Sequence, residues 1–489
     1  MADTLSVMLS FPPENSKSLS PTDFDKQMFA YTKSLEKIPA ASWTKSVDKK
    51  SLLEILDPSV NSVPYLKCLF DNIQVADDKD DKRMELLFDQ SSIFLASFDP
   101  IQVRFVGDMW RHLWEWALLR TQVLDVRDLS LFSTALLRLD PSAATFTTMH
   151  LRFVRQCLSM GTPRQALPII SKNIFAYPQT LAKNVPAEST SDEHEISNAF
   201  ITANSGFSAK VLPEYILEYY ILGAHVYIGI CDYQRARLFL EQVILYPTQQ
   251  HTTSSLQVEA YKKWVLIGLL FEGKLFPYPR TVDPGVWKQI KSMSKSYESL
   301  AESFEKRDWQ KYQAELDVGS QIWTDDGNMR LVTEVGHALV KYRVSDLQKT
   351  FAALPVSRVA THLGLAPEHT LNTLTQMIEQ SSLNATLTQG STSGDAILRF
   401  DLASSKGAAS LNTDLEAQTR RIETLISAVR DADRRLQLTK EHIAIAKRNK
   451  SAAAPDAELA DQMDLTWDAP GAGNGDQFVP EEDDEDIMS

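Results

Sequence analysis

Two stretches of this sequence repeat one pattern, and the repetition limits the folds that the chain can adopt. "RFVRQCLSMGTPRQALPIISKNIFAYP" (Arg152–Pro178) and "HVYIGICDYQRARLFLEQVILYP" (His225–Pro247) both place small and aromatic residues at helical intervals and both end in Tyr-Pro. Aligning Ala166 with Ala236 puts the copies 70 residues apart, which is about two units of a ~34-residue helical-hairpin repeat. One hairpin cannot bury its own apolar face, so the pattern predicts hairpins that stack on their neighbours.

The second copy follows the tetratricopeptide spacing closely. Tyr227 and Tyr233 are aromatic residues six positions apart, Ala236 follows three positions later, and Pro247 stands one position earlier than the pattern has it. Small residues let the two helices of a hairpin approach, and proline ends the second helix. We therefore expect these four residues to pack and terminate the repeats. An unrelated helical bundle is the alternative.

The fold expected for the whole chain is mostly α-helical. We predict a right-handed α-solenoid of TPR-like helical repeats that leads into a winged helix, then a long C-terminal helix and a disordered acidic tail. A polar stretch at 183–208 breaks the helical periodicity and is expected to be a loop between helical units. The expected divisions are 1–290 for the repeats, 291–340 for a further helical part, 341–404 for the winged helix, 411–450 for the C-terminal helix and 451–489 for the tail.

The winged helix is predicted from three short helices followed by a β-hairpin. The segments with helical spacing of apolar residues are "YRVSDLQKTFAAL" (342–354), "VSRVATHLGL" (356–365) and "APEHTLNTLTQMIEQSSL" (366–383). Two alternating strands, Ala385–Gln389 and Ala396–Phe400, flank a turn of Gly, Ser and Thr. Winged helices often bind DNA, but Val359–Leu398 contains no Lys or Arg that could neutralise phosphates. We therefore expect no nucleic-acid partner.

A heptad pattern marks the C-terminal helix. Thr413 and Glu416 have the spacing of a capping box, which predicts a helix start. Apolar residues then recur as the seam of a helix of about 35 residues, and the interface residues expected on it are Leu415, Ile422, Leu425, Val429, Leu436 and Ile443. Such a helix needs a partner for its apolar stripe, and we expect a bundle with helices of other chains. Packing against its own solenoid is the alternative.

Charge is concentrated at the C-terminus. The net charge is −14, and the residues after Lys450 contain no Lys or Arg but twelve acidic groups. The body is therefore close to neutral, and the tail is expected to be disordered. Two apolar islands in the tail, "MDLTW" and "QFVP", could be short docking motifs or simply solvated segments.

No catalytic or cofactor-binding pattern is present in the sequence. The nine histidines and three cysteines have no metal-ligand spacing, and neither a phosphate-binding loop nor a nucleophile elbow occurs. The sequence shows no secretory signal and no apolar run of the ~20 residues that span a bilayer. We expect a non-enzymatic protein without metal, cofactor or membrane association, soluble in a reducing compartment.

Helical repeats that run into a winged helix resemble the PCI-domain family. The residues that carry the resemblance are "YYILGAHVYIGICDYQRARLFLEQVI" (219–244), "EAYKKWVLIGLLFEGKL" (259–275) and "DDGNMRLV" (325–332), and the signalosome members are the most similar. The resemblance implies a non-catalytic scaffold of the complex that removes a ubiquitin-like modifier from cullins, in cytoplasm and nucleus. The implied partners are other PCI subunits and MPN subunits in a hetero-oligomer. A PCI scaffold of the proteasome lid or of a translation-initiation complex is the alternative.

In PCI proteins the edge of the winged-helix hairpin pairs with the hairpin of a neighbouring subunit. The resemblance implies this role for the two strands of the hairpin, and the residues expected at that interface are Ala385, Leu387, Gln389, Ile397, Leu398 and Phe400. A small sheet packed only against its own helices is the alternative, since edge strands need not bind partners.

Overall fold

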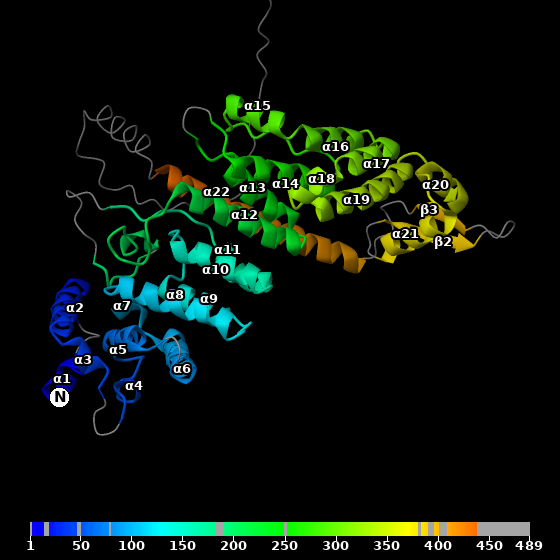
Figure 1. The fold of residues 1–489 in the computed structure, drawn as a ribbon. Helices are drawn as coiled ribbons and strands as arrows, with labels where there is room; N and C mark the ends of the chain where they lie inside the picture. Colours follow the sequence, from blue (N-terminus) through cyan, green and yellow to red (C-terminus); the bar gives the residue numbers. More distant parts are fainter. Residues whose placement is uncertain are drawn as a thin grey trace, which may run out of the picture. The chain divides into compact units, whose positions relative to one another are not determined.

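The computed structural model describes most of the chain as two separate units. The described residues are 2–13, 19–45, 50–77, 80–180, 189–194, 196–248, 252–379, 383–389, 396–400 and 408–437. The units are Met1–Phe400 and Asp401–Ser489. Nearly all regular structure in the described part is helical, so the predicted fold class is confirmed (Figure 1). None of the described helices is long and apolar enough to cross a membrane.

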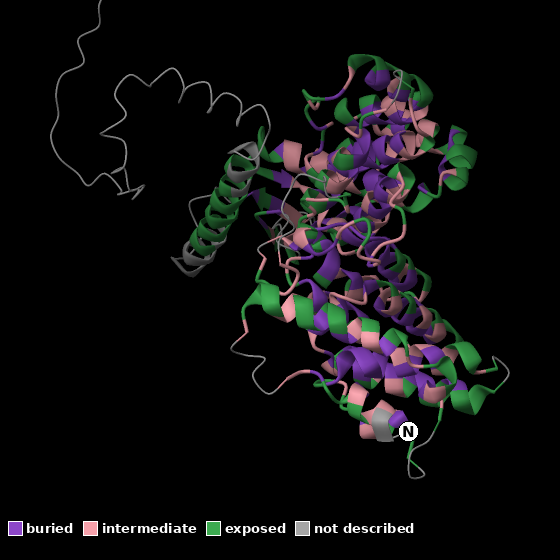
Figure 2. Cartoon of the chain, turned by 90° about the vertical axis from the view of Figure 1, so that its left-hand side faces the viewer, coloured by how far each residue is buried: buried purple, intermediate pink, exposed green. Residues whose placement is uncertain are grey.

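The first unit begins with helices packed around buried aromatic residues. They are α1 (Ala2–Met8), α2 (Pro21–Glu36), α3 (Ala40–Trp43), α4 (Leu52–Ile55), α5 (Ser62–Val75), α6 (Asp81–Ser97), α7 (Pro100–Val103), α8 (Gly107–Val123) and α9 (Ser130–Leu139). Trp110 and Trp114 of α8 are fully buried because they share one face of the helix with Leu113 and Leu118. Aromatic side chains provide much of the buried apolar area here, and Figure 2 shows it as the purple interior between the helices.

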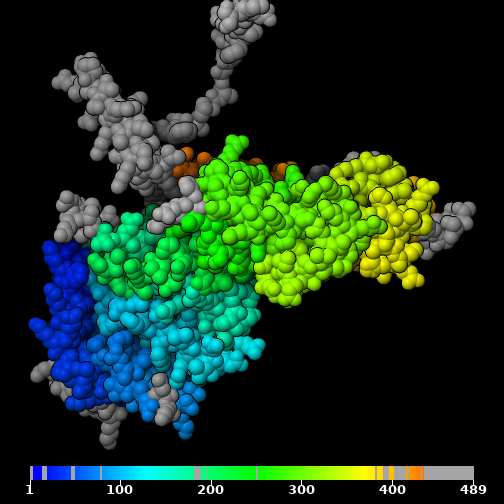
Figure 3. Space-filling view, turned by 45° about the horizontal axis from the view of Figure 1, so that its top comes forward, coloured from blue at the N-terminus to red at the C-terminus, as the bar shows by residue number. Residues whose placement is uncertain are grey.

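The repeats occupy the middle of the first unit. Their elements are α10 (Thr148–Ser159), η2 (Pro163–Ala166), α11 (Leu167–Ile170), η3 (Ser197–Ala199), α12 (Pro213–Gly229), α13 (Tyr233–Ile244), α14 (Ser255–Phe271), α15 (Pro284–Met293), α16 (Lys295–Glu305), α17 (Trp309–Val318), α18 (Ser320–Asp325) and α19 (Met329–Gln348). One apolar cluster runs from Met8 to Leu339, so the N-terminal helices and the repeats share a core. Figure 3 shows these parts following one another from blue to green.

The winged-helix region follows α19 and has a core of its own. Its elements are β1 (Ala353–Pro355), α20 (Val356–Leu363), α21 (Pro367–Glu379), β2 (Ala385–Gln389) and β3 (Ala396–Phe400). A second apolar cluster, from Val340 to Phe400, lies beneath the sheet. The helix expected over 342–354 is wrong at its end, because α19 stops at Gln348 and Leu354 lies in β1. Pro355 accounts for the extended conformation of Leu354, since the residue before a proline is disfavoured in the helical region.

The second unit contributes one described helix, α22 (Ala408–Gln437). α22 begins before the bound expected at 411, so the helix start predicted from Thr413 and Glu416 is wrong, and the expected helix is described as far as Gln437. Residues 438–450, Ile443 among them, and the acidic tail at 451–489 lie outside the described residues.

Candidate interaction surfaces

The hairpin of α12 and α13 contains the predicted repeat residues. Ala236 is fully buried between the helices, and Tyr227 is buried with its hydroxyl donating to the carbonyl of Ile170 at 3.1 Å. Tyr233 is half-buried at the start of α13, and Pro247 is exposed beyond its end. The Tyr227 hydroxyl thus joins the hairpin to α11, which lies earlier in the chain.

Glycine allows the close approach of the two helices at Gly223. A methyl group on Gly223 would lie 2.5 Å from the ring of Phe239, which is shorter than any real contact. The Phe239 ring in turn meets Tyr227 edge to face, with ring centroids 5.1 Å apart. Larger residues at position 223 would therefore force α12 and α13 apart.

The turn that joins the helices recurs in equivalent form 70 residues earlier. The Asp232 N–H donates to Tyr227 O at 2.9 Å, and the Thr162 N–H donates to Cys157 O at 2.8 Å. Each bond runs from the N–H of the sixth residue of the turn to the carbonyl of the first, and a second bond runs from the fifth residue to the second. This pair of bonds is the Schellman motif, in which the fifth residue has a left-handed backbone conformation. Those residues are Cys231, with φ +62°, and Gly161, with φ +70°.

Two further copies of this turn were not expected from the sequence. Asp308 N–H donates to Ser303 O at 3.1 Å, and Asn328 N–H donates to Trp323 O at 2.8 Å. The left-handed residues of these turns are Arg307 and Gly327, with φ +58° and +66°. The turn at Arg307 has a signal in the sequence, which is an Asp followed by an aromatic residue. Asp308 caps α17 by accepting a hydrogen bond from Lys311 N–H, as Asp232 caps α13 by accepting one from Arg235 N–H.

The two copies of the repeated pattern differ in their second helix. α13 has twelve residues, whereas the corresponding stretch after Gly161 forms only the short η2 and α11. Pro168 lies in α11, and the chain then extends, with Ala176 bridging to Thr145. The earlier copy therefore does not continue as a full hairpin.

The acidic turn before α19 is tied to two other helices by a cluster of polar groups. The ammonium of Lys262 lies 2.8 Å from both carboxylate oxygens of Asp326, and the Tyr297 hydroxyl donates to Asp326 Oδ2 at 2.8 Å. Asn328 Nδ2 donates to the Tyr297 oxygen at 2.9 Å. Burial, with the neighbouring Asp326, raises the pKa of Tyr297. The turn therefore fixes α14, α16 and α19 relative to one another.

The sheet of the winged helix has the order β1–β3–β2, which places β3 in the centre. β3 pairs with β2 along its whole length and with β1 through Ile397–Arg399. This corrects the expectation for Ile397, Leu398 and Phe400, because a strand paired on both sides cannot be an edge. The long edge is β2, which contains Ala385, Leu387 and Gln389.

The side chains of the hairpin alternate between the core and the outer face. Ala385, Leu398 and Phe400 are buried in the second core, and Leu387 packs partly against it. Thr386 and Arg399 are paired across the outer face and are exposed. Any contact of β2 with another chain would therefore use its backbone groups and the outer side chains rather than the buried ones.

The predicted seam of α22 is a row of exposed apolar side chains. Leu415, Ile422, Leu425 and Val429 are 63%, 56%, 57% and 58% exposed, and Ile426 is 46% exposed. At 3.6 residues per turn these positions share one face of the helix. Leu436 is part of α22, but its side chain is not described, and Ile443 lies beyond the described residues.

Comparison with known proteins identifies the family. A model described as COP9 signalosome complex subunit 3, N-terminal helical repeats, matches residues 31–286. The chain belongs to this family. It is similar to the COP9 signalosome complex subunit 3 of Emericella nidulans, with 35% identity over 376 residues, 73% of this chain and 74% of that protein. The subunit 3 of Neurospora crassa is 24% identical over 502 residues, 99% of this chain and 98% of that protein.

The signalosome family that the sequence resemblance indicated is thus confirmed. The matched range of the subunit 3 family model ends at residue 286 and so contains the α12–α13 hairpin and α14. The winged helix and α22 lie beyond that range, but the alignment with the Neurospora crassa protein extends over them.

In this subunit 3 family member burial shifts the pKa of two described thiols and of one imidazole. Burial raises the pKa of Cys68 and of Cys157 to about 12, the opposite of the shift that activates a thiol. His150 is buried, and burial lowers its pKa to about 4. In the part of the chain that the structure describes, no group of three or more His, Cys, Asp or Glu residues could hold a metal ion.

Proposed function

We propose that this chain is a non-catalytic scaffold subunit of a COP9 signalosome, the complex that removes the ubiquitin-like modifier from the cullins of cullin-RING ubiquitin ligases. Membership of the subunit 3 family supports the assignment. The proposed partners are the other PCI and MPN subunits, in the cytoplasm and the nucleus. The chain contributes contacts with these subunits, and the chemistry belongs to another subunit.

The observation that carries this proposal is the exposed apolar face of α22. Thirty residues of helix extend over about 45 Å, and five large apolar side chains on one face are 46–63% exposed. Exposed apolar rows of this length mark interaction sites, and a heptad repeat fits a partner helix. Ala432 and Thr439 at positions between the large residues favour a bundle with different helices over a tight homodimer.

The β2 edge is the second proposed contact. β2 is the long outer strand of the sheet, and its exposed side chains Thr386 and Thr388 are small and uncharged. An exposed edge strand without charge or proline is a template for pairing with a strand of another chain. We also propose the division of the chain into repeats, winged helix, bundle helix and tail at the residues given above.

A pair of substitutions in α22 tests the scaffold proposal. Leu425→Asp with Val429→Asp places two charges in the apolar row, and we expect this variant to fold but to be lost from the complex. Thr424→Asp with Ser427→Asp adds the same charge on the opposite face of the helix and should leave assembly intact. Native mass spectrometry of the complexes captured through each tagged chain measures which subunits remain bound.

The outcomes distinguish the alternatives. Loss of the signalosome subunits from the first variant alone supports the bundle. Retention of all subunits in both variants would contradict it. Capture of proteasome or translation-initiation subunits by the unmodified chain would contradict the signalosome assignment.

A further inference from the structure

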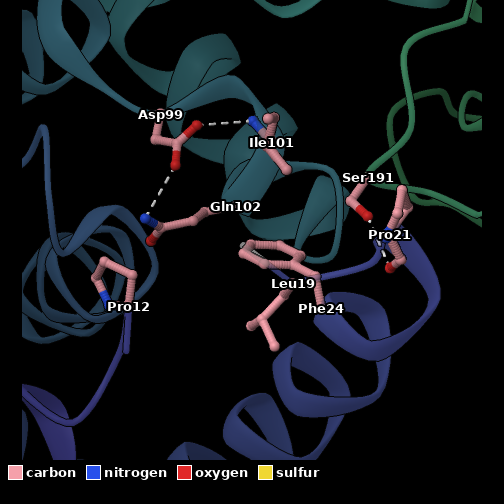
Figure 4. Close-up of a pocket in the computed structure, with 8 residues that line it drawn as sticks. All are labelled: Pro12, Leu19, Pro21, Phe24, Asp99, Ile101, Gln102 and Ser191. Carbon is pink, nitrogen blue, oxygen red and sulfur yellow. Dashed lines mark hydrogen bonds between the residues drawn. The ribbon is translucent and has the colours of Figure 1, made fainter. Parts of the chain in front are cut away.

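A pocket of about 400 Å³ lies between α2, α7 and the segment 189–194, which we call the strap (Figure 4). Leu19 and Phe24 form its apolar wall on the α2 side, and Ile101 and Gln102 belong to α7. Ser191 of the strap closes one side. The pocket is therefore assembled from three parts of the chain that are far apart in sequence.

The strap is held against α2 by the carboxylate of Asp25. Asp25 Oδ2 accepts hydrogen bonds from Thr190 N–H at 2.7 Å and from the Ser189 hydroxyl at 2.8 Å, and Oδ1 accepts one from Ser191 N–H at 3.2 Å. On the other side, Arg104 donates to the carbonyls of Thr190 and Asp192 at 2.9 Å. These bonds connect both walls of the pocket to the strap.

The amide of Gln102 presents a buried acceptor at this pocket. Its Nε2 donates to Val60 O at 2.9 Å and to Asp99 Oδ2 at 3.0 Å, which uses both amide hydrogens and fixes the amide orientation. Gln102 is only 2% exposed, and its Oε1 has no hydrogen-bond partner among the described residues. Figure 4 shows the nitrogen turned to Asp99 and the oxygen turned to the other side, toward Pro12. A buried acceptor without a donor is unfavourable, so this oxygen is suited to a donor from a bound group.

Asp99 places a carboxylate in the lining, and the nearby guanidinium of Arg104, which holds the strap, interacts with its charge. Its Oδ1 accepts from Ile101 N–H at 3.0 Å as the cap of α7. Among the eight described residues that line the pocket, Asp99 alone carries a charge. A carboxylate has about four acceptor sites, so Asp99 can accept further hydrogen bonds beside those from Ile101 and Gln102. The lining thus combines apolar walls, acceptor oxygens and one negative charge.

We propose that this pocket receives an arginine side chain of a partner protein. A guanidinium offers only donors, which match Gln102 Oε1 and the Asp99 carboxylate, and its planar face can stack on the half-buried Phe24 ring. Its aliphatic stem fits the apolar wall. A lysine has the charge but not the planar fork, and Trp or Tyr has a donor but no charge.

Binding of short peptides to the full-length chain tests the proposal. The probe is a blocked pentapeptide with one central Arg, and the matched control contains citrulline, which keeps the shape but has no charge. Isothermal titration calorimetry should detect the Arg peptide and show roughly tenfold or more weaker binding of the citrulline peptide. Equal affinity for the two peptides, or binding of neither, would overturn the proposal.

Three variants locate the binding. Asp99→Asn removes the charge but keeps a good helix cap, and Phe24→Ala removes the ring. Each substitution should weaken the binding of the Arg peptide by roughly tenfold or more. Phe29→Ala is the matched control, because Phe29 is on the same helix but contacts Phe105 away from the pocket. Unchanged affinity in Asp99→Asn and Phe24→Ala, or an equal loss in Phe29→Ala, contradicts the assignment.

A fourth variant keeps the test decisive if Asp99→Asn fails to fold. Ile101 is an exposed residue at the pocket, so Ile101→Lys should fold and place an ammonium group beside Asp99. We expect it to abolish binding of the Arg peptide. Retained binding in a folded Ile101→Lys protein would overturn the proposal.

Discussion

The guanidinium of Arg307 lies 5.1 Å from the ring centre of Tyr342 and 5.2 Å from that of Phe304. Arg307 also donates from Nε to Asp346 Oδ2 at 3.0 Å and from Nη1 to Gly273 O at 3.1 Å. Tyr342 and Asp346 are on α19, whose later residues contribute to the winged-helix core. Arg307 therefore joins a repeat turn to the helix that leads into the winged helix.

Arg307→Lys should weaken this junction. Lysine keeps the charge and the same left-handed backbone but cannot make the forked hydrogen bonds together with the ring contacts. We expect a loss of about 1–2 kcal/mol in the free energy of unfolding and faster hydrogen exchange in α19. Lys306→Ala, at the neighbouring exposed residue that pairs only with Glu302 in the described contacts, should change stability by less than about 0.5 kcal/mol. Equal effects of the two substitutions would contradict the role of Arg307.

Cys231 and Gly161 allow a reciprocal test of the repeated turn. Both have left-handed backbones at equivalent positions, and a residue with a Cβ is disfavoured there by about 1 kcal/mol. Cys231→Gly should therefore raise the stability by roughly that amount, and Gly161→Ala should lower it by a similar amount, since no atom stands within 4 Å of the added methyl group. Thermal unfolding measures both. Shifts of the same sign would show that the two turns are not equivalent.

The contributions of Lys262 and Asp326 to the free energy of unfolding should be strongly coupled. The two side chains are 17% and 24% exposed, and Asp326→Ala leaves both Lys262 and the Tyr297 hydroxyl without an acceptor. We expect Asp326→Ala to cost about 2–3 kcal/mol and the double variant with Lys262→Met to cost less than the sum of the single changes. Chemical unfolding of the natural chain, the two single variants and the double variant gives the coupling energy. Additive losses of stability would contradict an interaction between the two side chains.

His150 should make the stability of the first unit depend on pH. Burial lowers its pKa to about 4 in the folded chain, whereas an unfolded chain has about 6.5. Between those values the unfolded chain binds a proton that the folded chain does not, so stability falls as the pH falls through this range. The loss reaches about 2 kcal/mol at pH 5.

His150→Gln isolates this effect. His150 Nδ1 accepts from Thr147 N–H at 3.1 Å as part of a capping box, and glutamine is suited to that position. The variant should lose less stability than the natural chain between pH 7.5 and pH 5, as measured by urea unfolding. An identical pH dependence would assign the effect to other groups.

The helical elements could be predicted because their residues are periodic. Tyr227, Tyr233 and Ala236 lie within one turn and its flanking helices, so spacing alone places them together. β1 could not be predicted, because Phe351 and Leu354 continue the helical spacing of α19 and only Pro355 and the pairing with β3 favour a strand. For the same reason, sequence spacing did not indicate that β3 would be the central strand.

The pocket and the strap had no local signal in the sequence. Asp25 and Ser191 are 166 residues apart, and a polar loop such as 183–208 gives no indication of what it will contact. Gln102 is distinctive only because both of its amide hydrogens are used and its oxygen is buried. Sites of this kind depend on how distant segments meet, which local propensity does not determine.

The bonds between Asp25 and the strap have a consequence for synthesis of the chain. Helix α2 is synthesised early. The Asp25 carboxylate on this helix cannot accept hydrogen bonds from the N–H groups of Thr190 and Ser191 until those residues have left the ribosome. Because domains fold progressively as they are synthesised, the N-terminal helices remain without this anchor while α5 to α10 are translated. The final arrangement of the beginning of the polypeptide is thus completed only when its middle emerges.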